Sequence, residues 1–192
     1  RALTFEVPGR IWADGRELEP LNEGSVLSII NDLKTEKVEA VAVALLWSFV
    51  NPAHERRIGE LLDEHLPDVP FTLSHELNPT IREYRRCSSC AIDASLKPIM
   101  SNYLRSLKER LEARGLKGQI FAVTSQGGFV DLEQLAERPI LALNSGPSMA
   151  PVSGKFYAEL EGVEMAIITD AGGTTYDVSL VRDGVIPWSR DT

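Results

Sequence analysis

One stretch near the C-terminal end, residues 166–181 (AIITDAGGTTYDVSLV), limits the possible folds of this chain more than any other. A short apolar run leads into a tight turn, and the chain leaves that turn as alternating apolar and polar residues. This pattern predicts two strands joined by a hairpin. Two successive glycines, Gly172 and Gly173, permit positive backbone φ angles and let a bulky anion approach the main chain. We therefore expect the chemistry of this protein at the turn.

The polar side chains around the turn indicate what it binds. Thr174 and Thr175 add hydroxyl donors to the backbone N–H groups, a combination suited to phosphate oxygens. Asp170, at the end of the first strand, is placed to hold a hydrated Mg²⁺ beside those phosphates. An ordinary glycine hairpin between two core strands is the alternative. The aspartate and the threonine pair together favour the phosphate-binding interpretation.

A second candidate anion site lies upstream, at the start of a helix predicted over residues 144–160. Ser145 and Gly146 occupy the predicted helix N-terminus, where unpaired N–H groups favour an anion. Capping of the helix, with Pro147 in its first turn, explains the same residues equally well.

These motifs, in this order, resemble the connect and second phosphate segments of the actin-like ATPase superfamily. More closely, they are similar to the hydantoinase A, 5-oxoprolinase and acetone carboxylase family, in which a Ser-Gly-Pro loop precedes an Asp-x-Gly-Gly-Thr-x-x-Asp hairpin. Residues 46–55 (LWSFVNPAHE) and 81–86 (IREYRR) are also similar to segments of this family, and the similarity covers about residues 1–184. The chain departs from the family at residues 149–151 (MAP), where many members have Ala-Ala-Gly, so helix packing over the hairpin is expected to differ.

The resemblance implies an enzyme that binds Mg·ATP between two lobes. It would phosphorylate an oxygen of a cyclic amide, such as a hydantoin or 5-oxoproline, or of a ketone-derived enolate, for ring opening or carboxylation. In this scheme Gly172, Gly173 and Thr174 hold phosphoryl oxygens, while Asp170 positions the metal or its water. Asp170 and Asp177 remain alternatives for the catalytic base. A nucleotide-gated scaffold without small-molecule turnover, as in actin-like chaperones, is the alternative function, and a sugar kinase ranks third.

The resemblance also implies partners: a small-molecule substrate and a second subunit or domain of hydantoinase B type. A net charge of −8 argues against a nucleic-acid partner, which requires clustered Lys and Arg. No apolar run reaches the length of a membrane span, and two cysteines are too few for a disulfide framework, so we expect a cytoplasmic protein. The chain starts without Met, and we expect a piece of a longer enzyme that does not turn over ATP alone.

The remaining chain predicts an α/β fold, a layered sheet with flanking helices in a partial actin-like (ribonuclease-H-like) architecture. Helix, strand, helix and strand follow one another over residues 22–74, with a buried, parallel strand at 40–47. Upstream, Leu3–Val7 is expected as a strand before a hairpin with a turn at Asp14-Gly15. We expect one domain at residues 1–118 and another at 119–192.

Residues 78–114 predict a long helix, broken or kinked at Pro98. The apolar stripe expected to face the core comprises Ile81, Tyr84, Ala91, Leu96, Ile99, Tyr103, Leu107 and Leu111. The mixed charges of Arg82, Glu83, Arg85 and Arg86 are expected on a solvated face, although Arg82 is also a candidate for holding an anionic substrate.

Three smaller features complete the candidates. Ser125, Gly127 and Gly128 form a second glycine turn after a predicted strand, where the family carries a Ser-Asn-Gly-Gly-like turn, and either a substrate contact or a plain strand-to-helix turn fits them. Cys87 and Cys90 lack the partner pair that a zinc site needs and are expected to be inert. The histidines, His54, His65 and His75, are expected at the surface.

Overall fold

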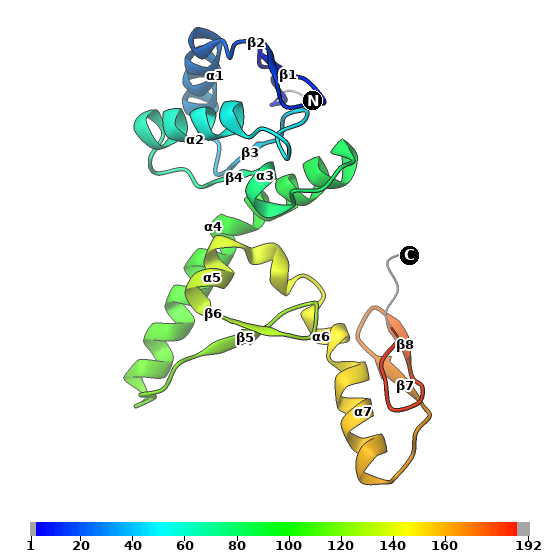
Figure 1. Cartoon of the computed structure of the whole chain (residues 1–192). Helices are drawn as coiled ribbons and strands as arrows, with labels where there is room; N and C mark the ends of the chain where they lie inside the picture. The colour runs from blue at the N-terminus through cyan, green and yellow to red at the C-terminus, as the bar shows by residue number, and fades with distance from the viewer. Residues whose placement is uncertain (1–2, 188–192) are drawn as a thin grey trace. The chain divides into compact units, whose positions relative to one another are not determined.

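The computed structural model describes residues 3–187 and divides the chain into two compact units (Figure 1). The first contains residues 1–114 and 136–140, and the second contains residues 115–135 and 141–192. Helices and four two-stranded sheets make up the regular structure of the described residues. The predicted mixed α/β class is confirmed. No helix within residues 3–187 combines the length and the apolar character needed to cross a bilayer.

The first unit is built on a parallel pair of strands, β3 (Val41–Val43) and β4 (Phe71–Leu73). The parallel strand predicted at 40–47 is therefore confirmed in kind, but it is shorter than expected. After β3 the chain turns over residues 46–50, where Trp47 has a φ of 60°. An apolar run cannot by itself show where a strand stops and a packed turn begins.

Two helices cover one face of this pair and form its core. Helix α1 (Glu23–Glu36) starts where Asn22 Oδ1 accepts a hydrogen bond of 2.9 Å from the Ser25 amide and caps the helix. Helix α2 (Ala53–His65) makes the crossover between the strands, as predicted. The buried apolar side chains of this core are Val26, Ile30, Leu33, Val43, Ile58, Leu61, Leu62, Leu66 and Leu73. Burying each large apolar side chain contributes about 1.5–3 kcal/mol.

The N-terminal segment forms one hairpin and not the additional strand that was expected. Strands β1 (Arg10–Ile11) and β2 (Glu17–Glu19) are antiparallel. The strand predicted at Leu3–Val7 is wrong, because residues 4–9 have no regular structure. Phe5 and Val7 instead pack against the core of the first unit, so their apolar character reflects burial rather than strand pairing.

The long helix of the first unit differs from its prediction in three ways. After the short helix α3 (Ser74–Leu77), α4 spans Glu83–Ala113, because Arg82 adopts a φ of 93° and delays its start. Pro98 lies inside this continuous helix and does not break it. The expected apolar stripe is also wrong in its main members. The side chains of Tyr84, Ile99 and Tyr103 are 84%, 70% and 58% exposed.

The opposite face of α4 is buried, and it carries polar residues. Arg86, Cys90 and Asp93 are each exposed by 1% or less. The Cys90 thiol donates to the Val43 and Thr72 carbonyls at 3.4 and 3.2 Å, so α4 lies against the second face of the parallel strand pair. This arrangement gives the predicted layering of helices on both faces of a sheet.

The second unit begins with a hairpin and ends with another. Strands β5 (Phe121–Val123) and β6 (Phe129–Asp131) are antiparallel and lead into α5 (Leu132–Glu137). A 3₁₀ turn at Pro139–Ala142 precedes the short helix α6 (Ser145–Ser148) and helix α7 (Ala150–Leu160). Strands β7 (Ala166–Ala171) and β8 (Tyr176–Val181) then form the C-terminal hairpin.

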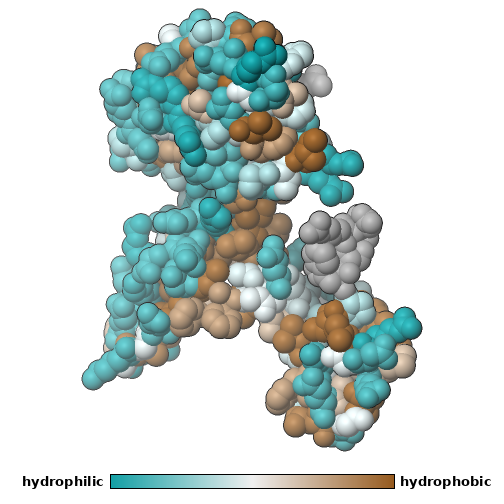
Figure 2. Space-filling model, viewed as in Figure 1, coloured by the Kyte–Doolittle hydropathy of each residue, from teal (hydrophilic) through white to brown (hydrophobic). Residues whose placement is uncertain are grey.

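The C-terminal hairpin packs on one face only within the described chain. Ile168 lies toward α7, and Val181 is 1% exposed. On the outer face the side chains of Ile167, Tyr176 and Val178 are 74%, 65% and 62% exposed. Apolar side chains are accordingly visible on the surface of this unit (Figure 2).

Candidate functional site

The glycine motif near the C-terminus forms the predicted hairpin turn. The last strand pair is Ala171 with Tyr176, and the Gly172 amide donates to the Thr175 carbonyl at 2.9 Å. The four residues between the strands, Gly172–Thr175, are exposed. The expectation of two strands joined by a tight turn is confirmed.

The glycines leave open space beside the main chain at this turn, and they do not supply the positive backbone φ angles that were expected. Neither Gly172 nor Gly173 has a positive φ, so that part of the expectation is wrong. A Cβ at Gly173 would find no neighbouring atom within 4 Å among the described residues. Within residues 3–187, the amides of Gly173 and Thr174 also form no hydrogen bond with the protein. Two backbone donors therefore face open space at the tip, as an incoming anion requires.

The two threonines have different surroundings. The Thr175 hydroxyl donates to Asp177 Oδ2 at 3.0 Å, which fixes that side chain against the second strand. Within the described chain the Thr174 hydroxyl makes no such bond, so it is available to a ligand. Asp177 thus braces the turn through Thr175.

Two carboxylates face each other across the hairpin. Asp170 on β7 is the direct strand partner of Asp177 on β8. Side chains of such pairs lie on the same face with Cβ atoms about 5 Å apart, and like charges placed there destabilise a hairpin. No group of three or more His, Cys, Asp and Glu side chains in the described residues is arranged to hold a metal ion. The pair is instead suited to share a cation with ligand and water oxygens, as Mg²⁺ sites commonly do.

Helix α7 fixes the position of the hairpin through one close approach. Gly154 lies so near Ile168 that a Cβ at this position would overlap the isoleucine side chain. Only glycine permits this approach, which places the helix directly over β7, the strand that carries Asp170. The helix begins at Ala150 with Pro151 in its first turn, so the MAP sequence at 149–151 is accommodated as a helix start.

The Ser-Gly-Pro segment forms its own short helix. Asn144 has a φ of 59°, and Ser145 and Gly146 begin α6, a helix of four residues. The Ser148 amide bonds to the Asn144 carbonyl at 3.2 Å. Among the described residues, no hydrogen bond joins this segment to the turn at Gly172–Thr175.

The turn at Ser125–Gly128 joins two strands, β5 and β6, and not a strand and a helix. Gly127 has a φ of 81°, a conformation that favours glycine. The Ser125 amide donates to the Leu141 carbonyl at 2.7 Å, and the Gly127 amide donates to the Thr124 carbonyl at 3.0 Å. Both amides are used within the protein, which leaves those of Gln126 and Gly128 as the possible ligand donors of this turn.

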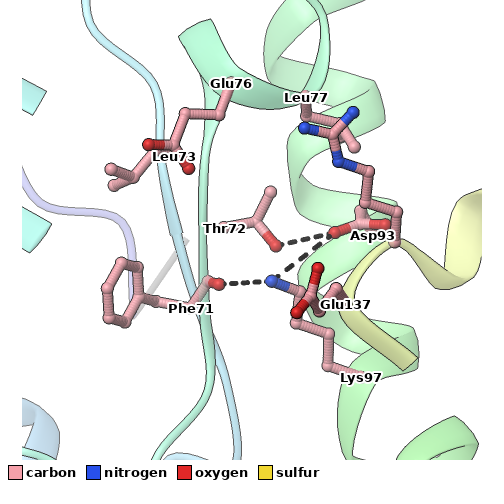
Figure 3. Close-up of a pocket in the computed structure, with 9 residues that line it drawn as sticks. Phe71, Thr72, Leu73, Glu76, Leu77, Asp93, Lys97 and Glu137 are labelled. Atoms are coloured by element: carbon pink, nitrogen blue, oxygen red, sulfur yellow. Dashed lines mark hydrogen bonds and ion pairs between the residues drawn. The ribbon is translucent and has the colours of Figure 1, made fainter. Parts of the chain in front are cut away.

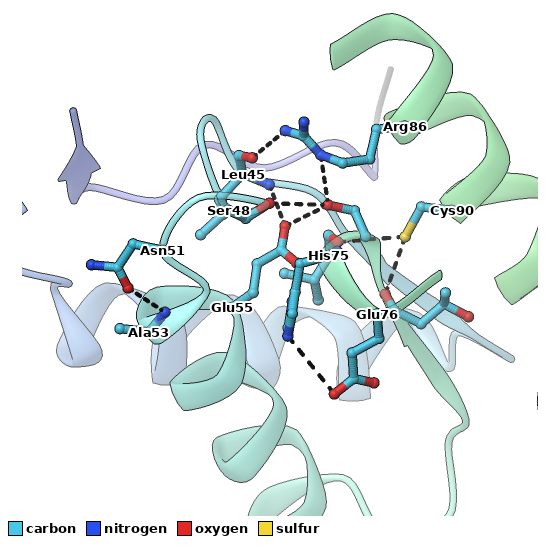
Figure 4. Close-up of polar contacts among 12 residues, drawn as sticks. Leu45, Ser48, Asn51, Ala53, Glu55, His75, Glu76, Arg86 and Cys90 are labelled. Atoms are coloured by element: carbon cyan, nitrogen blue, oxygen red, sulfur yellow. Dashed lines mark hydrogen bonds and ion pairs between the residues drawn. The ribbon is translucent and has the colours of Figure 1, made fainter. Parts of the chain in front are cut away.

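A buried polar network in the first unit was missed by the sequence analysis (Figure 4). The Glu55 carboxylate is fully buried and accepts hydrogen bonds at 2.7 Å from the Leu45 amide and at 2.6 Å from the Ser74 hydroxyl. Its second oxygen accepts from the His75 amide at 3.0 Å and lies 2.7 Å from His75 Nδ1. Because a carboxylate only accepts, Nδ1 must carry the proton. Glu55 therefore ties three chain segments together.

Arg86 completes this network from α4. Its Nε donates to the Ser74 hydroxyl at 3.0 Å, and its terminal nitrogens reach the Thr80 and Leu45 carbonyls at 3.2 and 2.5 Å. Its guanidinium also lies 5.3 Å from the centre of the Phe49 ring. The expectation of a solvated face is therefore wrong for Arg86. The spacing of Arg86, Cys90, Asp93 and Lys97 on one helix face was the signal that could have revealed it.

Two histidines predicted at the surface are also buried. His54 is 5% exposed and lies 2.7 Å from Glu17 Oε1. The side chain of His75 is 8% exposed, and its Nε2 has no hydrogen-bond partner in the described chain, with Glu76 3.8 Å away. The His65 side chain is 35% exposed. Local polarity along the sequence does not show that a histidine is held inside by a carboxylate.

The two cysteines, both expected to be inert, lie in different surroundings, and only Cys90 is shielded as an inert thiol would be. Cys87 is exposed and Cys90 is buried. Burial, and to a lesser extent the negative charge of Glu55, raise the pKa of the Cys90 thiol to about 12. A thiol with this pKa is protonated at neutral pH and is a poor nucleophile.

A polar pocket lies entirely within the first unit (Figure 3). Its volume is about 220 Å³, and its wall consists of Phe71, Thr72, Leu73, Glu76, Leu77, Asp93, Lys97, Glu137 and Arg138. Asp93 is fully buried at its base and accepts from the Thr72 hydroxyl at 2.8 Å and from the Ile140 amide at 3.2 Å. Lys97 Nζ donates to the Phe71 carbonyl at 2.6 Å and lies 3.9 Å from Asp93. Burial lowers the pKa of Lys97, although Asp93 opposes the change.

The fold and the hairpin together define a class: part of an actin-like α/β fold that carries a glycine-rich hairpin. Comparison with known proteins supports this class. The family model described as Hydantoinase/oxoprolinase matches residues 86–192, and the model described as Hydantoinase/oxoprolinase N-terminal region matches residues 1–66. The chain belongs to the hydantoinase/oxoprolinase family, as its motifs indicated.

Individual relatives agree with the family match. The chain is 35% identical over 192 residues to the caprolactamase subunit alpha of Pseudomonas jessenii, covering 100% of this chain and 28% of that protein. It is 33% identical to the acetophenone carboxylase gamma subunit of Aromatoleum aromaticum, covering 97% of this chain and 26% of that protein. The crystal structure of the ATP-dependent caprolactamase from Pseudomonas jessenii matches with a TM-score of 0.84 at 36% identity, over 91% of this chain and 25% of that one.

These shares mean that the chain spans about a quarter of the length of its relatives. The structural match confirms the predicted partial actin-like fold.

Proposed function

We propose that this chain is the part of an ATP-dependent enzyme that holds the nucleotide phosphates at the Gly172–Thr175 turn. One observation carries the proposal: the amides of Gly173 and Thr174 are unbonded within the described chain at an open tip. Preorganised backbone donors of this kind stabilise the charge of a transferring phosphoryl group. The ATP dependence of the caprolactamase relative supports the same assignment.

Mg²⁺ belongs to this proposal. Asp170 would hold the ion directly or through water, and its strand partner Asp177 would contribute the second negative charge. The ion would remove the repulsion between the two carboxylates and neutralise charge on the phosphates. Asp177 already accepts from the Thr175 hydroxyl, so we assign Asp170 as the metal-positioning residue and Asp177 as its brace.

The proposed reaction activates a cyclic amide or a ketone. The carbonyl oxygen of a cyclic amide attacks the γ-phosphorus of ATP, the bond to the bridging oxygen breaks, and ADP leaves. Water then adds to the activated carbon and the ring C–N bond breaks, which leaves an acyl phosphate. A second water attacks the acyl carbon, and inorganic phosphate departs with the original carbonyl oxygen while the carboxylate forms. In a ketone substrate the enolate oxygen would take the phosphoryl group before carboxylation. The caprolactamase and acetophenone carboxylase relatives support these two substrate classes.

A partner subunit is also proposed. The relatives are named as alpha and gamma subunits, which supports an assembly with at least one other kind of chain. A subunit of hydantoinase B type would complete the hydrolytic or carboxylating step. The cytoplasmic location stays a prediction. The scaffold alternative is not favoured, because the named relatives act on small molecules.

Oxygen-isotope transfer tests the reaction. The full-length enzyme, with its partner subunit, is incubated with ATP and caprolactam or 5-oxoproline labelled with ¹⁸O in the carbonyl group. We expect ¹⁸O in the inorganic phosphate, detected by mass spectrometry. Turnover that leaves all the label in the carboxylate product would contradict this route, in which water attacks the acyl carbon and the C–O bond to phosphate breaks. Hydrolysis of ATP that responds to neither cyclic amides nor ketones would instead favour the scaffold function.

A further inference from the structure

The pocket in the first unit is not used by the proposed nucleotide site. It is formed by β4, α3, α4 and the segment at 137–138, all of which belong to one compact unit. Its lining contains charges of both signs close together around Asp93 and Lys97 (Figure 3). A pocket that combines convergent polar groups with a partly buried lysine is a candidate ligand site.

At the inner end of the pocket Asp93 is held in place by the protein, and Lys97 keeps N–H donors for an acceptor atom of a ligand. Asp93 is held by the Thr72 hydroxyl and the Ile140 amide, so its position is fixed without a ligand. The Lys97 ammonium has three N–H donors. One is used by the Phe71 carbonyl at 2.6 Å, and Asp93 lies too far, at 3.9 Å, for a strong hydrogen bond. Lys97 therefore retains donor capacity for a ligand oxygen.

The mouth of the pocket carries the opposite charge. Glu76 and Glu137 are exposed at its edge. No ion pair with Lys or Arg is formed by either carboxylate in the part of the chain that the structure describes. Each of these carboxylates is a possible acceptor for a ligand ammonium group, Glu76 on the side of Leu73 and Glu137 beside Lys97 (Figure 3).

The balance of charge limits the class of ligand. Three carboxylates, Glu76, Asp93 and Glu137, face two cations, Lys97 and Arg138, so the formal charge of the lining is −1. A multiply charged anion such as free phosphate would be repelled by the carboxylates. A metal cation is disfavoured by the lysine, and these carboxylates do not converge into a metal-binding group among the described residues. A molecule with one positive and one negative group satisfies both ends.

We propose that this pocket binds a small zwitterion, an amino acid. Its carboxylate is held by Lys97 with help from Arg138, and its ammonium group by Glu76 and Glu137. The apolar side chains of Phe71, Leu73 and Leu77 pack against the carbon chain between the two charged groups. The site is independent of ATP.

Calorimetric titration of the full-length protein without nucleotide tests the proposal. The probes are glycine, β-alanine and γ-aminobutyrate, which differ in the spacing of their charges. Butyrate and butylamine each retain one charge of γ-aminobutyrate. We expect saturable binding of at least one zwitterion, and affinities for both half-charged analogues that are lower by roughly tenfold or more. No saturable binding of any zwitterion, or equal binding of the analogues, would overturn the proposal.

Two variants and two matched controls place the binding in this pocket. Lys97→Met removes the inner cation and Glu137→Gln removes an exposed carboxylate, and each should weaken the best zwitterion by roughly fivefold or more. Lys34→Met and Glu36→Gln change exposed residues of α1 and should leave the affinity unchanged. Because Glu137 is exposed, its variant tests the site even where Lys97→Met fails to fold. Binding that both pocket variants leave intact would show that the site lies elsewhere.

Discussion

Glu55 is the residue on which the polar interior of the first unit depends. It receives every one of its hydrogen bonds from inside the protein, and it connects the turn after β3 with the start of α3. Removing the acceptor from a buried set of donors leaves those donors without a partner, which costs far more than the net value of the bonds.

We predict that Glu55→Gln lowers the free energy of unfolding by about 2–4 kcal/mol, because the amide NH₂ group would face donors. Glu60→Gln on the same helix is the control, since the Glu60 side chain is 64% exposed and pairs with Arg57. The control should change stability by about 0.5 kcal/mol or less. Denaturant titration measures both, and equal effects would show that the network is not what stabilises the unit.

The cysteines provide a second test at this scale. In the folded protein we expect a thiol reagent to label Cys87 quickly and Cys90 only after unfolding, because Cys90 is buried with a pKa of about 12. In the Cys87→Ser variant we therefore expect no rapid labelling at position 87 or at Cys90, measured by mass spectrometry of the peptides. Fast labelling of Cys90 in that variant would contradict the packing of α4 against β3 and β4.

The lowered pKa of Lys97 predicts the direction in which its contribution to folding stability changes with pH. Its pKa is lowered by burial from 10.5, so in the interval below 10.5 the unfolded chain binds more protons than the folded one. The contribution of Lys97 to stability therefore rises with pH in that interval. We expect wild-type protein to gain stability relative to Lys97→Met as the pH is raised from neutrality towards 10.5. A relative loss over the same range would mean that pairing with Asp93 outweighs burial.

At the scale of single elements, the contact between α7 and β7 decides how the C-terminal hairpin is held. Gly154 is the single glycine of α7, and a Cβ at this position would overlap the Ile168 side chain. We predict that Gly154→Ala pushes the helix away from the strand and lowers the melting temperature. The double variant with Ile168→Ala should recover part of the loss, because it removes the Cγ1 and Cδ1 atoms that a Cβ at position 154 would overlap.

Ile168→Ala alone is the control for this pair. It should destabilise by about 2–5 kcal/mol, through the lost apolar carbons and the space left behind. Thermal unfolding of the single and double variants gives the coupling between the two positions. Additive effects would show that the helix does not depend on this approach.

The sequence predicted those elements whose signals are local. Asn22 marked the start of α1, and the double glycine marked the hairpin of β7 and β8. The orientation of α4 could not be predicted in this way. Its apolar residues, such as Tyr84 and Ile99, suggested one face, but the buried face is polar because Arg86 and Asp93 find partners on distant segments. Hydrophobic periodicity assumes that the core is apolar, and here that assumption fails.

In the candidate site, too, local sequence predicted some features, while others depend on contacts between distant segments. Residues Asp170–Thr175 were found from sequence because a turn and its ligand donors are contiguous. The pairing of Asp170 with Asp177 and the close approach of Gly154 depend on strand register and helix packing, which no local pattern specifies. The pocket around Lys97 draws on segments separated by more than sixty residues, since Phe71 and Arg138 both line it.

For the whole molecule, the family match and the hairpin geometry lead to one central claim: the turn at Gly172–Thr175 receives the phosphates of ATP. The chain spans about a quarter of its relatives, so the claim concerns the full-length enzyme. Gly173 allows a direct test, because its φ is not positive and a side chain there would meet no atom within 4 Å among the described residues. A substitution should therefore leave the fold intact while filling the space that a phosphate needs.

Gly118 is the matched control, since it too lacks a positive φ, and a Cβ there would meet no atom of residues 3–187 within 4 Å. The decisive measurement is the Kd of Mg·ATP for the full-length Gly173→Val and Gly118→Val variants, with their melting temperatures recorded alongside. We predict that Gly173→Val binds roughly tenfold or more weakly at an unchanged melting temperature, while Gly118→Val binds like the wild type. Wild-type affinity in a stably folded Gly173→Val protein would contradict the account.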